Sequence, residues 1–292
     1  MLAEFTLGRA RPKAISYKEA VELYLEDKRQ AKRPSTVAGY KLLLARLNFK
    51  GALADITYDD AARKLGKFTT AGMRSHILVA ARAFFNWCIK RRYISENPFA
   101  GLEKPATPPR TRVLSDSELS RIWRATAEPT GFNRIVRLSL LTGQRRGEAA
   151  QLRAEYVAGA VCTFPAAITK NGREHSFPLA PMALELVGSC RTNAIYILTG
   201  TEKPFNNYGA AKAALDKASG VTGWTLHDLR RSVATKMAGD LGIAPHVIER
   251  ILNHITGTLS PLARVYNRAT FHKEMAEALT AWETRLAALI AA

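Results

Sequence analysis

The sequence predicts a mainly α-helical protein with a small antiparallel β-sheet, divided into two domains. Apolar residues recur at helical spacing through most of the 292 residues, and N-cap signals precede several of these runs. Four prolines cluster within residues 97–112 and separate the helical patterns into two groups. β-Prone segments around Asn171-Gly172 interrupt the second group. A chain of this length can bury an apolar core in each of two domains.

Residues 16–100 predict a helical domain that follows an N-terminal extension, residues 1–15. Ser16 and Glu19 have the spacing of a capping box, which opens a helix to residue 29. Ser35 and Thr36 are expected to open a second helix. Its apolar positions are Val37, Tyr40, Leu44 and Leu47. A third helix is predicted over residues 70–92, with an apolar stripe of Ile77, Ala80, Phe84, Trp87 and Cys88.

Residues 101–112 are expected to link this domain to a second one over residues 113–292. Ser115 and Glu118 again have capping-box spacing and open a helix to residue 127. Within residues 161–179, β-prone segments flank Asn171-Gly172, whose residue types suit a tight hairpin turn. Further helices are predicted over residues 133–141, 181–190, 206–218, 226–238, 245–253 and 271–289.

The charge balance points to a polyanionic partner. The chain has 43 lysines and arginines against 25 aspartates and glutamates, a net charge of +18. The excess is shared, with 20 basic and 10 acidic residues up to residue 107 and 23 and 15 after it. If the partner is a nucleic acid, both domains are therefore expected to contact it.

Composition excludes several other classes of protein. Hydrophobic residues make up 47% of the chain, which is typical of a globular fold and not of intrinsic disorder. The longest segment without a charged residue, 156–169, is too short to span a bilayer as a helix. Neither a signal peptide nor a CxxC pair is present, and the three cysteines are expected to be reduced packing residues. These features predict a cytoplasmic protein with no membrane partner.

Four short segments carry residues suited to phosphoryl chemistry. LTGQRRGE places Arg145 at a turn after a helix-ending glycine, and TKNGR places Lys170 at the tip of the predicted hairpin, on a movable loop. WTLHDLRRS places His227 and Arg230 on one helical face. ILNHITGTLSPLARVYNR carries His254 and Tyr266.

Each of these residues also has an ordinary structural explanation when taken alone. Arg145 is also typical of a solvated helix face, and Lys170 is also typical of an ordinary turn. His227 fits a helix cap or a core position, and Tyr266 a packed aromatic. Together they form a coherent set for attack on a phosphodiester: cations for the transition-state charge, proton donors, and a hydroxyl nucleophile.

The order TGQRRGE, TKNGR, HDLRR, LNH and VYNR resembles the tyrosine recombinases, also called phage integrases. The residues from Trp224 to Arg268 are similar to those of the prophage and satellite-phage branch. The resemblance implies a helical core-binding domain of SAM-like fold followed by a mixed α/β catalytic domain. Many relatives in this branch carry an additional arm-site-binding domain. The short segment ahead of the first helix fits a compact integrase or a truncated chain.

The resemblance also implies roles for individual residues. Tyr266 would attack the scissile phosphate and form a 3′-phosphotyrosyl bond. Arg145 and Arg230 would hold the non-bridging oxygens, and Lys170 would protonate the leaving 5′ oxygen. His227 would assist proton transfer with Tyr266, and His254 would support the phosphate. Glu148 would buttress the site, and neither a metal nor another cofactor would be needed.

The implied function is site-specific recombination of DNA attachment sites through a Holliday junction by a homotetramer. The branch favours integration and excision of a phage or other mobile element. A host DNA-bending protein and a directionality factor are candidate further partners in a nucleoid-associated setting. For the last helix, the resemblance adds docking onto a neighbouring copy as an alternative to packing on its own domain.

Other functions are alternatives to this one. The first is a DNA-binding protein of the same fold without chemistry, which the complete six-residue set argues against. The second is a chromosome-dimer resolvase, which shares the chemistry of the integrases, as does a type IB topoisomerase. The third is a metal-dependent nuclease that uses His227 and Asp228, but this pair lacks the further ligands that such a site needs.

Overall fold

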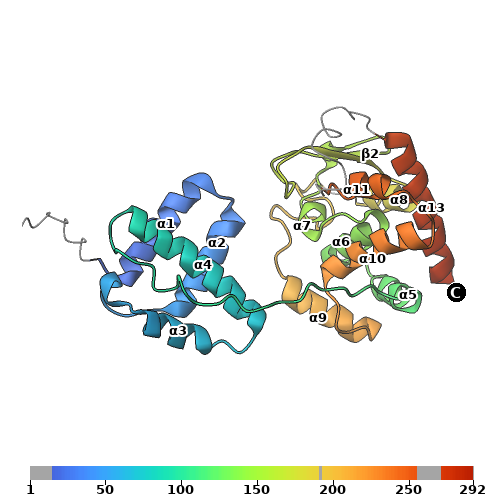
Figure 1. Cartoon of the computed structure of the whole chain (residues 1–292). Coiled ribbons are helices and arrows are strands. Elements are labelled where there is room, and N and C mark those ends of the chain that lie inside the picture. Colours follow the sequence, from blue (N-terminus) through green and yellow to red (C-terminus); the bar gives the residue numbers. More distant parts are fainter. Residues whose placement is uncertain (1–14, 191–192, 255–270, 292) are drawn as a thin grey trace, which may run out of the picture. The chain divides into compact units, whose positions relative to one another are not determined.

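The computed structural model describes residues 15–190, 193–254 and 271–291, and it separates into two compact units (Figure 1). The first unit is Met1–Arg110 and the second is Thr111–Ala292. The boundary falls inside residues 101–112, the proline-rich segment that the sequence predicts to be a linker. Each unit has an apolar core of its own.

The first unit is helical and packs around an aromatic core. Its elements are α1 (Tyr17–Ala31), α2 (Pro34–Leu47), the 3-10 helix η1 (Leu53–Asp55), α3 (Tyr58–Gly66) and α4 (Ala71–Lys90). The predicted α4 stripe is buried throughout. Tyr17 and Tyr24 of α1 meet the ring of Phe84 edge to face, at centroid distances of 5.6 and 5.4 Å. The stripe therefore serves packing.

Local chemistry explains where these helices differ from the predictions. The Ser16 hydroxyl accepts the Glu19 amide at 3.2 Å, as expected at the start of α1. Helix α2 starts at Pro34 and not at Ser35-Thr36, because proline is pre-shaped for the first helical turn, where its missing N–H costs nothing. Helix α4 ends before Arg92, which adopts a positive φ of 58°. Helix α3 was not predicted, although Thr57 and Asp60 form a complete capping box at its start.

The second unit combines helices with a small sheet. In chain order its elements are α5 (Asp116–Ala125), α6 (Gly131–Thr142), α7 (Arg146–Ala149), η2 (Ala154–Tyr156), β1 (Val157–Ala158), β2 (Val161–Phe164), β3 (His175–Pro178), α8 (Pro181–Gly188), α9 (Tyr208–Ser219), α10 (Leu226–Gly239), α11 (Pro245–Ile251) and α13 (His272–Ala291). The mainly α fold with a small antiparallel sheet is therefore confirmed. The Ser115–Glu118 capping box forms as predicted at α5.

The hairpin is antiparallel as predicted, but its turn is not the predicted tight one. Strands β2 and β3 pair from Val161↔Pro178 to Phe164↔His175, so residues 165–174 form a long connecting loop. A two-residue turn of the predicted type needs a positive φ at both central residues, and only Gly172 of the pair adopts one, at 70°. The short strand β1, which was not predicted, extends the sheet in the order β1-β2-β3.

Helix α13 packs on its own unit. It buries Trp282 and Leu286 in the core of the second unit, and the Trp282 indole donates to the Leu140 carbonyl at 2.9 Å. The buried Glu283 carboxylate accepts the Met182 and Ala183 amides at the start of α8, at 2.7 and 2.9 Å. Of the two interpretations of this helix, the structure shows intramolecular packing. Burial raises the pKa of Glu283.

The structure also bears on the cysteines and on membrane-spanning helices. The three cysteines are free and buried. Over the part of the chain that the structure describes, no helix combines the length and the hydropathy needed to cross a membrane.

Candidate active site

The site begins where α6 ends, at Gly143. This residue caps α6 in the left-handed conformation, with φ at +68°. A Cβ atom there would lie 2.6 Å from Cδ2 of Leu252. Glycine is therefore required both by the backbone and by the close approach of the chain after α11. The predicted helix end at Gly143 is confirmed.

The chain after α11 forms a Schellman turn. The Asn253 amide donates to Arg250 O at 3.0 Å, and the His254 amide donates to Glu249 O at 2.9 Å. Asn253 adopts the left-handed conformation, with φ at 49°, which asparagine tolerates better than most residues. The predicted helix over 245–253 therefore ends at Ile251. The carbonyls of Ile251, Leu252 and Asn253 remain available to side chains from other segments.

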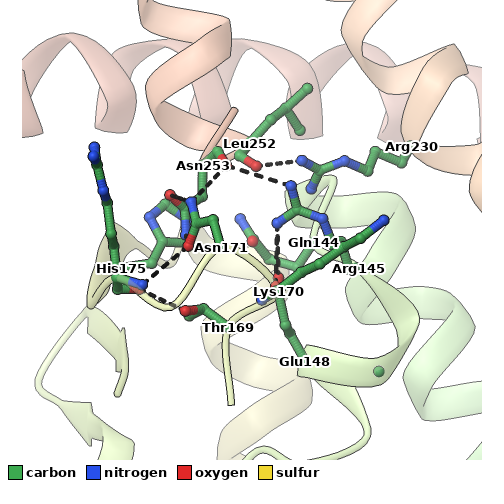
Figure 2. A network of polar contacts seen from close by, with 12 residues as sticks. Gln144, Arg145, Glu148, Thr169, Lys170, Asn171, His175, Arg230, Leu252 and Asn253 are labelled. Carbon is green, nitrogen blue, oxygen red and sulfur yellow. Dashed lines mark hydrogen bonds and ion pairs between the residues drawn. The ribbon is translucent and has the colours of Figure 1, made fainter. Parts of the chain in front are cut away.

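Side chains from three other segments converge on these carbonyls (Figure 2). Ile251 O accepts Gln144 Nε2 at 2.8 Å and contacts His175 Nε2 at 3.0 Å. Leu252 O accepts Arg230 Nη2, and Asn253 O accepts Arg145 Nη2 at 3.3 Å. We call these three acceptors the α11 carbonyl cluster. It brings together two arginines that are 85 residues apart in the sequence.

Arg145 is held from two sides. It is the N-cap residue of α7, and its Nη1 forms an ion pair at 3.1 Å with Glu148 one turn later. The Glu148 side chain is almost fully buried, at 3% exposure, and its Oε1 also accepts the Lys170 amide at 2.9 Å. Glu148 therefore connects Arg145 to the loop that carries Lys170.

Arg230 lies on the first turns of α10 and is itself buried. A complete capping box between Thr225 and Asp228 fixes the start of this helix. Arg230 Nη1 donates to Gly143 O at 2.6 Å, while its buried Nε has no hydrogen-bond partner among the described residues. Burial and the nearby Arg145 lower the pKa of Arg230 to about 9, which leaves it charged at neutral pH.

The two arginines impose a positive potential on the histidines around them. Partial burial, followed by the charges of Arg230 and Arg145, lowers the pKa of His254 to about 4. Partial burial, Arg230 and Arg231 lower the pKa of His227, and Lys170 contributes in the same direction. Both imidazoles are therefore neutral at pH 7. A site with several cations in one place is arranged to receive an anion.

The structure brings most of the candidates from the sequence together. Arg145, Glu148 and Arg230 contact one network, and His227 lies on α10 one turn before Arg230. Lys170 lies in the turn closed by Gly172 N donating to Thr169 O at 3.2 Å. His254 directly follows the α11 carbonyl cluster. Tyr266 lies outside the described residues.

Four members of the network were not among the candidates chosen from the sequence: Gln144, Asn171, His175 and Asn253. Each lies inside or beside one of the four motifs named above, and this position next to a candidate residue is the signal that the sequence offers. Gln144 and His175 contact Ile251 O, and Asn171 contacts Asn253. These contacts are long-range, and the sequence alone does not reveal them. No group of three or more histidine, cysteine or acidic side chains in the described ranges could hold a metal ion.

Comparison with protein families gives a match that covers more than half of the chain. The model of the phage integrase family matches residues 112–272, which include all the motifs listed above. The chain belongs to the phage integrase family. The family predicted from TGQRRGE, TKNGR, HDLRR, LNH and VYNR is therefore confirmed.

Similar proteins agree with this family and with the fold. Prophage integrase IntZ of Escherichia coli (strain K12) is 25% identical over 238 residues, which cover 77% of this chain and 58% of IntZ. The chain thus spans little more than half the length of that relative. A lambda integrase dimer bound to a COC′ core site superimposes with a TM-score of 0.68 at 20% identity, covering 84% of this chain and 97% of the other. Tn1549 transposon integrase in complex with circular intermediate DNA gives 0.58 at 18% identity, covering 88% and 98%.

The first prediction concerns Gly143 of this phage integrase. Gly143→Ala is expected to lower the free energy of unfolding of the second unit by about 1 to 3 kcal/mol, because alanine is strained at positive φ and its Cβ presses on Leu252. Urea denaturation of the full chain measures the effect. Gly147→Ala is the matched control, since nothing lies within 4 Å of its Cβ and its φ is not positive. Equal stability of the two variants would contradict the assignment.

The second prediction concerns pH and His175. Burial lowers the pKa of His175 to about 4, against about 6.5 in an unfolded chain. Between these values only the unfolded state binds the proton, so acidification from pH 7 to pH 4 removes up to about 3 kcal/mol of stability. His175→Gln keeps a donor for Ile251 O and should lose this part of the acid sensitivity. Urea titrations of both proteins at several pH values measure it, and parallel curves would refute the prediction.

Proposed function

We propose that this chain is a site-specific DNA recombinase that cleaves and rejoins duplex DNA through a 3′-phosphotyrosyl bond to Tyr266. The observation that carries the proposal is the pairing of Arg145 and Arg230 on the α11 carbonyl cluster. The two guanidinium groups repel one another, since the charge of Arg145 lowers the pKa of Arg230. A bound phosphate oxyanion offsets that repulsion. Arginine forks suit the non-bridging oxygens of a phosphodiester.

The proton transfers follow from the electrostatics of the site. His227 is neutral at pH 7 because burial and the arginines lower its pKa, so it is able to accept the proton of the Tyr266 hydroxyl. The phenolic oxygen attacks phosphorus, and the bond from phosphorus to the 5′ oxygen breaks. Lys170 donates a proton to that leaving oxygen. Its charge contributes to the lowered pKa of His227, which supports its membership of the same site.

Rejoining reverses these steps on a different strand. A 5′ hydroxyl attacks the phosphotyrosyl phosphorus, Lys170 takes up its proton, and Tyr266 leaves with a proton returned by His227. The energy of the phosphodiester is kept in the covalent intermediate, so strand exchange needs no ATP. His254 and Glu148 act on the phosphate and on Arg145, respectively.

The larger context is proposed on the same basis. The first unit, Met1–Arg110, is the core-binding domain, and the second, Thr111–Ala292, is the catalytic domain. The positive charge shared by both parts of the sequence supports DNA contact by each. IntZ is a prophage integrase, and a lambda integrase tetramer bound to a Holliday junction has the same fold, with a TM-score of 0.68 at 19% identity over 84% of this chain and 79% of the other.

These similarities support integration and excision of a phage or other mobile element by a homotetramer. The reaction takes place on attachment sites in double-stranded DNA, in the cytoplasm and in association with the nucleoid. A host DNA-bending protein and a directionality factor complete the proposed partners.

The third prediction is a covalent adduct at Tyr266. The substrates are synthetic nicked suicide duplexes whose sequences are taken from the genomic DNA on both sides of the coding gene. They are mixed with the full chain in EDTA. Wild type should give a slowly migrating protein–DNA band on a denaturing gel, because the broken strand cannot be rejoined once its short end diffuses away. Tyr266→Phe lacks the nucleophile and should give no band.

Two measurements accompany this gel. Salt-dependent binding of the same duplexes by Tyr266→Phe shows that the variant is folded and still recognises DNA. An adduct formed by Tyr266→Phe, or cleavage that appears only when a divalent metal is added, would contradict the proposed mechanism.

A further inference from the structure

A pair of asparagines closes the site opposite the arginines. Asn171 Nδ2 donates to Asn253 Oδ1 at 2.6 Å and to Asn253 O at 3.2 Å. In return, Asn253 Nδ2 approaches Asn171 Oδ1 at 3.4 Å. We call this pair the asparagine clasp. It joins the β2–β3 loop to the turn after α11, and these segments are separated by 82 residues.

The clasp completes a closed ring of polar contacts (Figure 2). Arg145 binds the Glu148 carboxylate, and that carboxylate accepts the Lys170 amide. Asn171 follows Lys170 in the chain and holds Asn253, whose carbonyl accepts Arg145 Nη2 at 3.3 Å. Lys170 is therefore tied to Arg145 by two routes, one through Glu148 and one through the clasp.

Both ends of the clasp are fixed by their own backbone. Asn171 Oδ1 accepts the Arg173 amide at 3.2 Å, which orients the amide side chain within the loop. Asn253 occupies the left-handed position of the Schellman turn, so its side chain is presented from a defined backbone. Neutral amides suit this place because each offers a donor and an acceptor without adding charge to a cationic site.

We propose that Asn171 and Asn253 are positioning residues, which hold the backbone of the turn so that Lys170 faces the leaving oxygen while Arg145 holds the phosphate. This rests on the proposed function, in which Lys170 is the proton donor. A loop of ten residues between β2 and β3 would otherwise leave the place of Lys170 weakly defined. Loss of the clasp should therefore impair proton donation more than DNA binding.

The test uses the duplex that wild type cleaves in the adduct experiment, made with either oxygen or sulfur at the 5′ bridging position of the scissile phosphate. A thiolate leaves without a proton donor because thiols are far more acidic than alcohols. Asn171→Ala should slow single-turnover adduct formation at least about tenfold on the oxygen duplex and change the rate on the sulfur duplex less than about threefold. Lys170→Ala is the reference for a lost proton donor.

Further variants separate positioning from general damage. Asn171→Asp keeps the size of the side chain but faces two oxygens of Asn253 without a donor, so it should resemble Asn171→Ala. Asn253→Gly keeps the left-handed backbone and loses the side chain, and it should show the same recovery on sulfur. Glu174→Gln, at an exposed position of the same loop, should match wild type on both duplexes. Wild-type rates for Asn171→Ala, or equal slowing on both duplexes, would overturn the proposal.

Hydrogen–deuterium exchange tests the clasp without requiring activity. In the full chain, Asn171→Ala should raise exchange of the Lys170 amide at least about tenfold, because the loop no longer keeps that amide on Glu148. Asn253→Gly should have the same effect, and the double variant should add little to either. Unchanged exchange would overturn the clasp, whereas failure of wild type to form an adduct would contradict the proposed function alone.

Discussion

The site depends on the carbonyl groups that remain free where α11 ends. A helix leaves its last carbonyls without intrahelical partners, and the Schellman turn at Asn253 satisfies those of Glu249 and Arg250. Gln144, Arg145, His175 and Arg230 bind the carbonyls that follow. Side-chain donors and backbone acceptors thus assemble segments from α6, the sheet, α10 and α11. The same bonds orient the arginines in the absence of any anion, so in the proposed reaction a phosphate would meet donors that are already in place.

Electrostatics gives this geometry its chemical meaning. Removing the charge of a guanidinium group costs much free energy, so Arg145 and Arg230 stay charged and repel one another. The Glu148 carboxylate and backbone carbonyl dipoles offset part of that repulsion. The same positive charge lowers the pKa of His227 and His254. In the proposed reaction the neutral His227 accepts a proton and the neutral His254 acts on the phosphate, while the positive charge comes from Arg145, Arg230 and Lys170. Under the proposed function, this one arrangement accounts for phosphate binding and for the direction of proton transfer.

The fold class, most helices and the family can be predicted from the sequence because these depend on local signals. Capping boxes at Ser115 and helix-ending Gly143 can be read from neighbouring residues. The prediction of a tight hairpin turn was wrong. The residue types of Asn171-Gly172 suit such a turn, but the strand pairing places ten residues between Phe164 and His175. The clasp between Asn171 and Asn253, and the burial of His175 on Ile251 O, depend on contacts across more than 70 residues, for which one sequence holds no signal.

The proposed function requires the α11 carbonyl cluster to hold Arg145 and Arg230 as one phosphate-binding pair. The most direct measurement is a crystal structure of the full chain soaked with orthovanadate, which resembles a phosphoryl group in charge and shape. A single vanadate should contact both guanidinium groups, with Gly143 O, Leu252 O and Asn253 O still bound to them. Vanadate bound to one arginine alone, or arginines that leave the carbonyls to reach separate anions, would contradict the proposed function.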